Sequence, residues 1–190
     1  MTDTPRYQDL SKFRMPPDFR GRSAFLCQLW WLVQDSLFRL SPQFMYGFRA
    51  TLLRLFGAKI GRNVLLRSTV RVTYPWKIEI GDHVWVGDDC VFYSLGNITV
   101  GSNVAVAHGV YFCTGLHDYT KIDFPIGAKP IHICDEVWLP NDTFVGPGVT
   151  IGRGAIVGAR STVLHDLPEG MICVGSPAKP LRPRVITNPD

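Results

Sequence analysis

The fold is decided by residues 133–167, ICDEVWLPNDTFVGPGVTIGRGAIVGARSTVLHDL, in which aliphatic residues recur at a strict spacing of six. A second, mostly small series follows each aliphatic residue four positions later. The aliphatic series is Ile133, Leu139, Val145, Ile151, Val157 and Val163, and the second series is Val137, Thr143, Val149, Ala155 and Ser161. Neither the helical period of about 3.6 residues nor strand alternation produces this pattern. A short fixed period is typical of a solenoid, and a period of about six residues indicates a parallel β-helix.

The spacing of six has a direct geometric meaning. Six residues form one short strand and a turn, and three such units close a triangular coil of about eighteen residues. The aliphatic residue points into the prism, and the small residue lets the backbone turn at a corner. Gly146, Gly152 and Gly158 directly follow three of the aliphatic residues, and we expect them to relieve the turn geometry. Stacked coils pair their strands with the coils above and below and bury a continuous column.

The same spacing extends upstream with one interruption. Three further coils begin at Ile60, Ile80 and Val100, which are twenty residues apart, so each carries a two-residue bulge. Residues 118–132 contain two prolines and no sixfold register, and they are predicted to form a loop that leaves the prism. We therefore expect an all-β solenoid of about five coils. The predicted organisation is an N-terminal arm and helical cap at 1–58, a β-helix at 59–168 and a tail at 169–190.

Two helices are predicted ahead of the solenoid. The first spans Ala24–Leu40, and the second begins with Ser41 as its N-cap and Pro42 in its first turn and ends near Phe56. A membrane span needs about 20 apolar residues, and the first helix is shorter and contains polar residues. Two locations remain open for the pair. It caps the open end of the solenoid, where a sheet edge needs cover, or it makes a peripheral contact with the inner membrane face through 24–56.

Composition limits the class of protein. The chain has 190 residues, 46% hydrophobic and 19% charged, which is typical of one globular domain. Residues 1–78 carry 13 Lys or Arg and 4 Asp or Glu, whereas residues 79–190 carry 7 and 12, so the basic N-terminal part suits an anionic lipid or a phosphorylated substrate.

The five cysteines are odd in number and form no CxxC pair, which favours a reducing cytoplasm. Residues 1–22 lack the apolar core of a signal peptide, and no nucleic-acid-binding motif is present in the sequence.

A catalytic role is predicted for His117, which lies in the segment TGLHDY (114–119) that ends the third coil beside the loop. An imidazole next to a cleft can act as a general base near neutral pH. The alternative is a surface imidazole without a role. A zinc site needs ligands that converge on one point. Because His108 and His117 occupy different corners of one coil, no metal is expected.

Several segments together resemble a known family. The hexapeptide coils, the TGLHDY segment with its loop, GPGVTIGRGAIVGARS (146–161) and the tail GSPAKPLR (175–182) resemble the left-handed β-helix acyltransferases of the galactoside and maltose O-acetyltransferase group. LWWLVQ (29–34) and LLRLFGAKIG (52–61) are most similar to the colanic-acid biosynthesis acetyltransferases of bacterial polysaccharide clusters. The resemblance implies left-handed coils and a homotrimer with its active sites between subunits. It also implies direct transfer from acetyl-CoA to a sugar hydroxyl in a ternary complex, with His117 as the base.

The resemblance further implies which residues contact the substrates. Acetyl-CoA, the co-substrate, is expected at Ala107, Asn141, Ala159, Lys179 and Arg182. The acceptor is expected to be a saccharide or lipid-linked saccharide of an exopolysaccharide, with contacts at Asp88, Asp89, Asp118 and Tyr119. Gly87 stands where the family has a sugar-contacting asparagine, so the acceptor pocket is expected to differ from that of a simple galactoside enzyme.

Three other functions remain open at the level of the sequence. An N-acetyltransferase that acts on an amino-sugar nucleotide would use the same fold, and it would depend less on a base because a neutral amine is already nucleophilic. A solenoid carbonic anhydrase would need zinc. A non-catalytic scaffold would need neither His117 nor the loop nor the tail.

Overall fold

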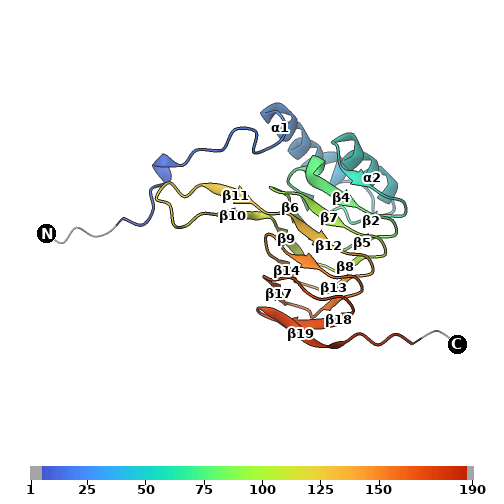
Figure 1. Cartoon of the computed structure of the whole chain (residues 1–190). Coiled ribbons are helices and arrows are strands. Elements are labelled where there is room, and N and C mark those ends of the chain that lie inside the picture. The colour runs from blue at the N-terminus through green and yellow to red at the C-terminus, as the bar shows by residue number, and fades with distance from the viewer. Residues whose placement is uncertain (1–5, 188–190) are drawn as a thin grey trace.

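A parallel β-solenoid forms the body of the molecule in the computed structural model, which describes residues 6–187 (Figure 1). Three sheets, here called A, B and C, line the sides of the prism, and each coil contributes one strand to each sheet. Sheet A joins β1 (Lys59–Ile60), β4 (Ile78–Ile80), β7 (Ile98–Val100), β12 (Ile131–Ile133) and β15 (Thr150–Ile151). Sheet B joins β2 (Leu65–Leu66), β5 (Trp85–Val86), β8 (Ala105–Val106), β13 (Trp138–Leu139), β16 (Ile156–Val157), β18 (Met171–Gly175) and β19 (Ala178–Pro183). Sheet C joins β3 (Arg71–Val72), β6 (Val91–Tyr93), β9 (Tyr111–Cys113), β14 (Phe144–Val145) and β17 (Thr162–Val163). Five complete coils and the start of a sixth confirm the predicted solenoid.

The strand register confirms the inward aliphatic series. The inward residues of sheet A lie side by side in successive coils, in the order Ile60, Ile80, Val100, Ile133 and Ile151. These side chains and their equivalents on sheets B and C are buried in one hydrophobic core along the solenoid. The spacing of six is thus the distance along the chain from one inward position to the next.

The corner between sheets C and A carries the extra residues of the longer coils. From the inward residue of sheet C to that of sheet A the chain takes eight residues in the first two coils (Val72 to Ile80 and Phe92 to Val100) and six in a regular coil (Val145 to Ile151). The chain also leaves the stack at this corner after β9. The corner is therefore where insertions are accommodated without disturbing the core.

The segment predicted as a loop at 118–132 is more ordered than expected. Strands β10 (Gly115–His117) and β11 (Ile126–Ala128) form an antiparallel hairpin, and β12 already begins at Ile131. The N-terminal segment, with a short 3₁₀ turn at Leu10–Lys12, runs beside the tip, where the Asp9 N–H donates to the Ile122 carbonyl at 2.6 Å. Figure 1 shows the hairpin and this segment projecting together away from the solenoid.

The glycines that follow the inward aliphatic residues have a different structural role from the predicted relief of turn geometry. Their φ angles are not positive, and the left-handed position lies two residues later, where the chain has Asn63, His83 or a second glycine such as Gly148 or Gly154. A Cβ atom on Gly81 would lie 2.8 Å from a backbone carbon of the next coil, and one on Gly152 would lie 2.5 Å from the backbone nitrogen of Glu169. Glycine is therefore required because the next coil packs directly against it, and not because the turn needs it.

Helices α1 (Ala24–Val33) and α2 (Tyr46–Leu55) cover the end of the solenoid at β1, β2 and β3 (Figure 1). Helix α1 continues into a π-helical turn at Gln34–Phe38. The predicted start of the second helix is wrong, because its N-cap residue is Met45. The Ser41 hydroxyl donates to the Phe38 carbonyl and accepts from Arg49, so a long-range contact uses the group that resembled a helix cap.

The two helices pair the free edge of the first coil through side chains. Sheet edges without partners invite aggregation, and here polar side chains bond to backbone groups that the edge exposes. The contacts are Arg54 to the carbonyls of Ile60 (3.0 Å) and Gly61 (2.7 Å), Arg49 to that of Leu66 (2.6 Å), Trp30 to that of Val72 (2.7 Å), and the Val72 N–H to Gln34 (2.6 Å). The helices therefore act as a cap.

The opposite end is closed by the hairpin of β18 and β19. Strand β18 pairs in parallel with β16, so sheet B extends into the segment predicted as a tail, and β19 folds back antiparallel to β18. Among residues 6–187, no helix has both the length and the apolar character needed to cross a membrane.

Candidate active site

His117 lies half-buried at the end of β10, where the hairpin tip fixes its orientation. Its Nδ1 atom lies 2.9 Å from the carbonyl oxygen of Phe124, and its ring stacks on the Phe124 ring with centroids 4.2 Å apart. Phe13 of the N-terminal segment approaches the imidazole with centroids 6.3 Å apart. A carbonyl oxygen can only accept a hydrogen bond, so Nδ1 carries the proton and Nε2 of the neutral ring keeps its lone pair. His117 is thus held in the tautomer that a general base needs.

The hairpin tip in turn holds the Phe124 carbonyl. Phe124 has a φ of +48°, in the left-handed region, and its N–H donates to the Lys121 carbonyl at 3.0 Å. Asp118 accepts from the backbone N–H and the hydroxyl of Thr120 at 3.1 and 2.5 Å. The hydrogen bonds from Thr120, together with the nearby Lys121 ammonium, lower the pKa of Asp118. The Asp118 carboxylate is therefore engaged within the turn, whereas the side chain of Tyr119 is exposed.

A second group of predicted site residues lies at the corner between sheets B and C. Ala107, Asn141 and Ala159, here called the corner column, follow β8, β13 and β16 in successive coils. The Asn141 side chain accepts from the His108 N–H at 3.3 Å, and its backbone carbonyl accepts from the Arg160 N–H at 2.9 Å. The structure therefore brings three predicted acetyl-CoA contacts from separate coils to one corner of the prism, with Asn141 and Ala159 in register and Ala107 one residue earlier in its coil.

Lys179 and Arg182, the other two predicted acetyl-CoA contacts, lie exposed on β19 beyond the last coil. Lys179 pairs with Val174 of β18, and Arg182 lies farther along, opposite Ile172. The Gly175 N–H donates to the Ser161 hydroxyl at 3.0 Å, which ties this hairpin to the last corner of the stack. Lys179 thus lies near the end of the corner column, whereas Arg182 lies back along sheet B, opposite Ile172, which pairs with Ile156.

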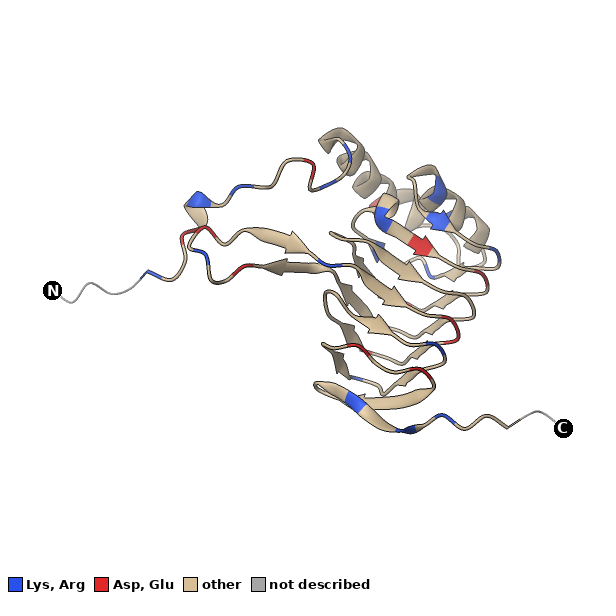
Figure 2. Ribbon diagram, in the orientation of Figure 1, with Lys and Arg blue, Asp and Glu red and all other residues tan. Residues whose placement is uncertain are grey.

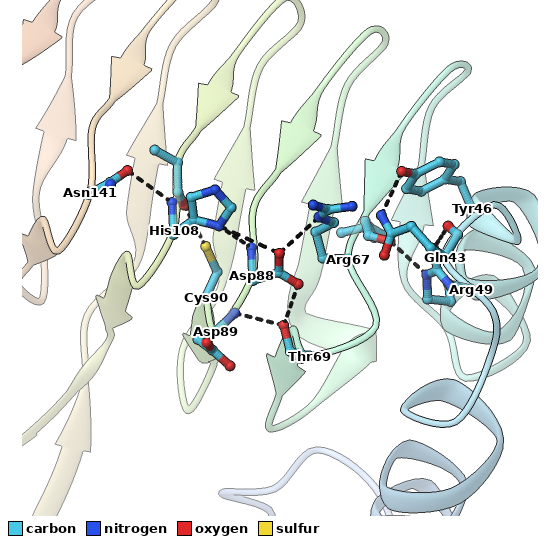
Figure 3. A network of polar contacts seen from close by, with 12 residues as sticks. Gln43, Tyr46, Arg49, Arg67, Thr69, Asp88, Asp89, Cys90, His108 and Asn141 are labelled. Atoms are coloured by element: carbon cyan, nitrogen blue, oxygen red, sulfur yellow. Dashed lines mark hydrogen bonds and ion pairs between the residues drawn. The ribbon is translucent and has the colours of Figure 1, made fainter.

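A polar network surrounds Asp88 at the same corner, nearer the cap (Figure 3). The Asp88 carboxylate accepts from Arg67 and from Thr69, both at 2.9 Å. The Asp88 N–H donates to Nδ1 of His108 at 2.9 Å, so the neutral His108 ring carries its proton on Nε2. Asp89 is exposed and left-handed, with a φ of +58°. Of the two predicted acceptor contacts at this corner, Asp88 is thus ion-paired with Arg67, and Asp89 presents its carboxylate to solvent.

A groove next to this network was missed by sequence reasoning. It has a volume of ≈ 290 Å³, and Arg67, Trp85, Ala107 and His108 are among its lining residues. Trp85 stands on the outer face of sheet B with 63% of its surface exposed. A signal was present, because the residue before each inward aliphatic residue must face outward. A tryptophan at such a position marks an apolar outer surface.

The structure does not bring the corner column and His117 together within one chain. Ala107 precedes β9 and His117 follows it, so sheet C lies between them. Asp88 and Asp89 share the corner of the column, whereas Tyr119 lies on the hairpin with His117. The predicted site residues therefore form two groups, on either side of sheet C.

The cysteine and histidine side chains bear on thiol and metal chemistry. Burial raises the pKa of Cys90 to about 12 and also raises the pKa of Cys113, so both thiols are poor nucleophiles at neutral pH. Cys90 is fully buried, and all five cysteines are unpaired. Within the described part of the chain, no group of three or more His, Cys, Asp or Glu side chains is arranged to hold a metal ion. His108 and His117 lie on opposite sides of sheet C.

Comparison with known proteins defines the class. Residues 130–165 match the family model described as bacterial transferase hexapeptide (six repeats). The hexapeptide-repeat acetyltransferase VCA0836 of Vibrio cholerae, solved with acetyl coenzyme A, is 27% identical, with a TM-score of 0.79 over 87% of this chain and 92% of that one. A maltose O-acetyltransferase of Clostridium difficile 630 is 25% identical, with a TM-score of 0.72 over 85% and 89%. The fold is that of the hexapeptide-repeat acetyltransferases.

A closer relative is WcaF of Escherichia coli K12, which carries the name of a colanic acid biosynthesis acetyltransferase. It is 53% identical over 180 residues, which are 95% of this chain and 99% of WcaF. The chain therefore belongs to the hexapeptide-repeat acetyltransferase family, and the assignment made from the sequence is confirmed.

Proposed function

We propose that this chain is an acetyl-CoA-dependent O-acetyltransferase that acts on a sugar hydroxyl in bacterial exopolysaccharide synthesis, with His117 as general base. The observation that carries the proposal is the 2.9 Å contact between His117 Nδ1 and the Phe124 carbonyl, because it leaves Nε2 available to accept a proton. The name of WcaF and that of the maltose O-acetyltransferase support a saccharide hydroxyl as the acceptor.

The reaction is a direct transfer in a ternary complex. Nε2 of His117 accepts the hydroxyl proton while the hydroxyl oxygen attacks the thioester carbonyl carbon of acetyl-CoA. The carbonyl oxygen becomes an oxyanion, which a hydrogen-bond donor must stabilise. When the C–S bond breaks, the acetyl group stays on the sugar oxygen and the CoA sulfur takes the proton from the imidazolium. No enzyme nucleophile is needed, in agreement with the raised pKa of the Cys113 thiol.

The corner column is the proposed donor site. Acetyl-CoA is the ligand of VCA0836, and the same donor is proposed for this chain. Ala107 and Ala159 are small, which leaves room for a pantetheine arm along the edge of the prism. Lys179 and Arg182 supply positive charge for the nucleotide phosphates.

A complete site requires two copies of the chain, because sheet C separates the corner column from His117. The proposed assembly is a homotrimer. Sheets B and C expose apolar or aromatic side chains, whereas sheet A exposes mostly polar ones. The outward residues are Leu65, Trp85, Ala105, Trp138 and Ile156 on sheet B, Arg71, Val91, Tyr111, Phe144 and Thr162 on sheet C, whose three middle coils are the apolar ones, and Lys59, Glu79, Thr99, His132 and Thr150 on sheet A. Two adjacent apolar faces per prism suit a closed ring of three, in which each face meets a different neighbour.

The proposed acceptor is a saccharide or lipid-linked saccharide held between copies. Asp88, Asp89 and the groove beside Trp85 would face it from one copy, and Tyr119 with His117 from the next. A cytoplasmic location is proposed, because acetyl-CoA is made there and because the five cysteines are unpaired.

Thiol release from acetyl-CoA tests the proposal, measured with a panel of sugars, amino sugars and undecaprenyl-linked saccharides. His117→Ala should lower turnover by about 10²–10⁴-fold, the usual contribution of a general base, and leave binding of CoA nearly unchanged. His165→Ala, an exposed histidine of the last coil, is the matched control and should retain activity. Full turnover by His117→Ala would refute the base, and a preference for amino acceptors would support N-acetylation instead.

A further inference from the structure

The outer surface of the cap carries a stripe of large apolar side chains. Five large apolar residues on one side of the first helix are separated by four, three, five and three positions. They stay on one face because the π-helical turn lengthens the third step. We call this set the outer stripe: Phe25, Leu29, Leu32, Leu37 and Leu40. Four of the five are more than half exposed, at 76%, 67%, 57% and 79% for Phe25, Leu32, Leu37 and Leu40. Phe44, just beyond the helix, is 80% exposed.

The outer stripe does not serve the core of the chain. The opposite side of the same helix supplies the buried residues Cys27, Trp30, Gln34 and Phe38. Trp30 and Gln34 already bond to both backbone groups of Val72, so the docking of the helix on the solenoid is complete without the stripe. An exposed contiguous apolar surface of this kind on a folded protein marks an interaction site.

Charge beside the stripe indicates the kind of partner. Residues 20–54 contain five arginines and one acidic residue, Asp35, which pairs with Arg71 at 3.4 Å. Figure 2 shows Lys and Arg on the cap and on the segment that leads into it. Arg22 and Arg39 are exposed next to the ends of the stripe and take part in no ion pair among residues 6–187. Apolar side chains bordered by arginines suit a membrane interface that contains anionic lipid.

A second copy of the chain fits this surface less well. A symmetric contact would bring the same patch of each copy together, so Arg22 and Arg39 would face like charges. The surface also lies at the end of the prism and not on sheets B and C, the faces proposed for the trimer. A bilayer satisfies both the apolar side chains and the arginines.

We propose that the outer stripe, together with Phe44, Arg22 and Arg39, docks the protein peripherally on a bilayer that contains anionic lipid. The helix lies in the plane of the interface, with Phe25, Leu32 and Leu40 among the acyl chains and the arginines at the headgroups. This docking is independent of the proposed activity, because none of its residues belongs to the candidate active site.

Flotation with vesicles tests the docking on the full chain without acetyl-CoA or acceptor. The probes are vesicles of phosphatidylglycerol and phosphatidylethanolamine, and vesicles of phosphatidylcholine alone. The wild type should float with the anionic vesicles, less at high salt, and bind phosphatidylcholine weakly. Phe25→Gln/Leu32→Gln/Leu40→Gln should lower the partition coefficient at least about tenfold, since three apolar side chains no longer enter the acyl region. Arg22→Gln/Arg39→Gln should lower it about tenfold or more on anionic vesicles only.

The matched control is Leu164→Gln/Val185→Gln/Ile186→Gln, which removes three exposed apolar side chains outside the cap and should bind as the wild type does. Circular dichroism must show the same melting curve for each variant. Wild-type protein that stays in the soluble fraction at low salt, or a stripe variant that floats as well as the wild type, overturns the docking. A lipid-free sedimentation coefficient that falls in the stripe variant also overturns it, because the stripe would then join copies of the chain.

Discussion

Arg49 is the most completely buried cation of the cap, and its replacement by methionine tests how the open end of the solenoid is held. The side chain is 0% exposed and pairs with no carboxylate among residues 6–187. Its guanidinium makes four hydrogen bonds instead, to the carbonyls of Leu66 (2.6 Å), Pro42 (2.9 Å) and Gln43 (2.7 Å) and to the hydroxyl of Ser41 (2.8 Å). It also lies over the Tyr46 ring, with Cζ 5.0 Å from the centroid. Figure 3 shows it at the junction of the cap and the first coil.

The expected cost follows from these contacts. Arg49→Met keeps the apolar stem and removes the charge, so the desolvation that lowers the pKa of Arg49 is relieved. Against this, the Leu66 carbonyl is left without its side-chain donor in the interior, and the Pro42 and Gln43 carbonyls, which lie nearer the surface, must turn to water. Bonds to a charged group contribute about 1.5–3 kcal/mol each, and relief of desolvation offsets part of the sum, so we expect a net loss of about 3 kcal/mol.

Urea unfolding followed by far-ultraviolet circular dichroism measures this loss, with all proteins at one concentration because an oligomer's stability depends on it. Arg39→Met is the control, since Arg39 is exposed and its loss should change the unfolding free energy by less than about 0.5 kcal/mol. Arg49→Lys should also be destabilised, because one ammonium cannot reproduce the forked geometry. An Arg49→Met protein as stable as the control, with an unchanged denaturant slope, would show that the cap is held by apolar packing alone.

Four further outcomes are expected. Gly101→Ala should lose about 2–4 kcal/mol in the same unfolding assay, because its Cβ would lie 2.7 Å from a backbone nitrogen of the next coil. Cys113→Ser should keep turnover within about twofold, as a protein without a thiol nucleophile would; a complete loss would favour an acyl-enzyme. Lys179→Ala/Arg182→Ala should raise the KM for acetyl-CoA about tenfold while kcat changes little, and added salt should narrow the difference from the wild type. Hydrogen bonds from the Arg62 N–H and guanidinium depress the pKa of Asp82, so its contribution to stability is present above its ordinary pKa and is lost as the pH falls through the depressed value. Asp82→Asn should therefore lose stability at neutral pH and converge on the wild type in acid titrations.

The coils were predictable because one physical requirement repeats. An inward position must be apolar in every coil, so the alignment of Ile80 with Val100 and Ile133 can be read from spacing alone, across the inserted hairpin. The second helix was misplaced because Ser41 bonds to Arg49, eight residues away, a contact with no local signal. The hairpin of β10 and β11 was missed for a similar reason, since its pairing follows no period.

The sequence could single out candidate site residues, but it could not show their geometry. His117 stands out in the sequence because the period fails directly after it. Its tautomer depends on the Phe124 carbonyl, seven residues away in a left-handed turn, which only the folded hairpin reveals. The groove at Trp85 was not predicted, because residues at outward positions follow no repeat. Whether an outward residue lines a groove depends on its neighbours in the fold.

The stacked coils also give the proposed donor site a fixed unit of length. Each coil advances the edge of the prism by one strand spacing, about 4.8 Å. Ala107, Asn141 and Ala159 mark three successive steps, and Lys179 lies on the hairpin after the last. The distance along the edge from Ala107 to the hairpin of β18 and β19 is therefore set by the number of coils between them. Adding or removing a coil would therefore change the length of the proposed donor site in steps of about 4.8 Å.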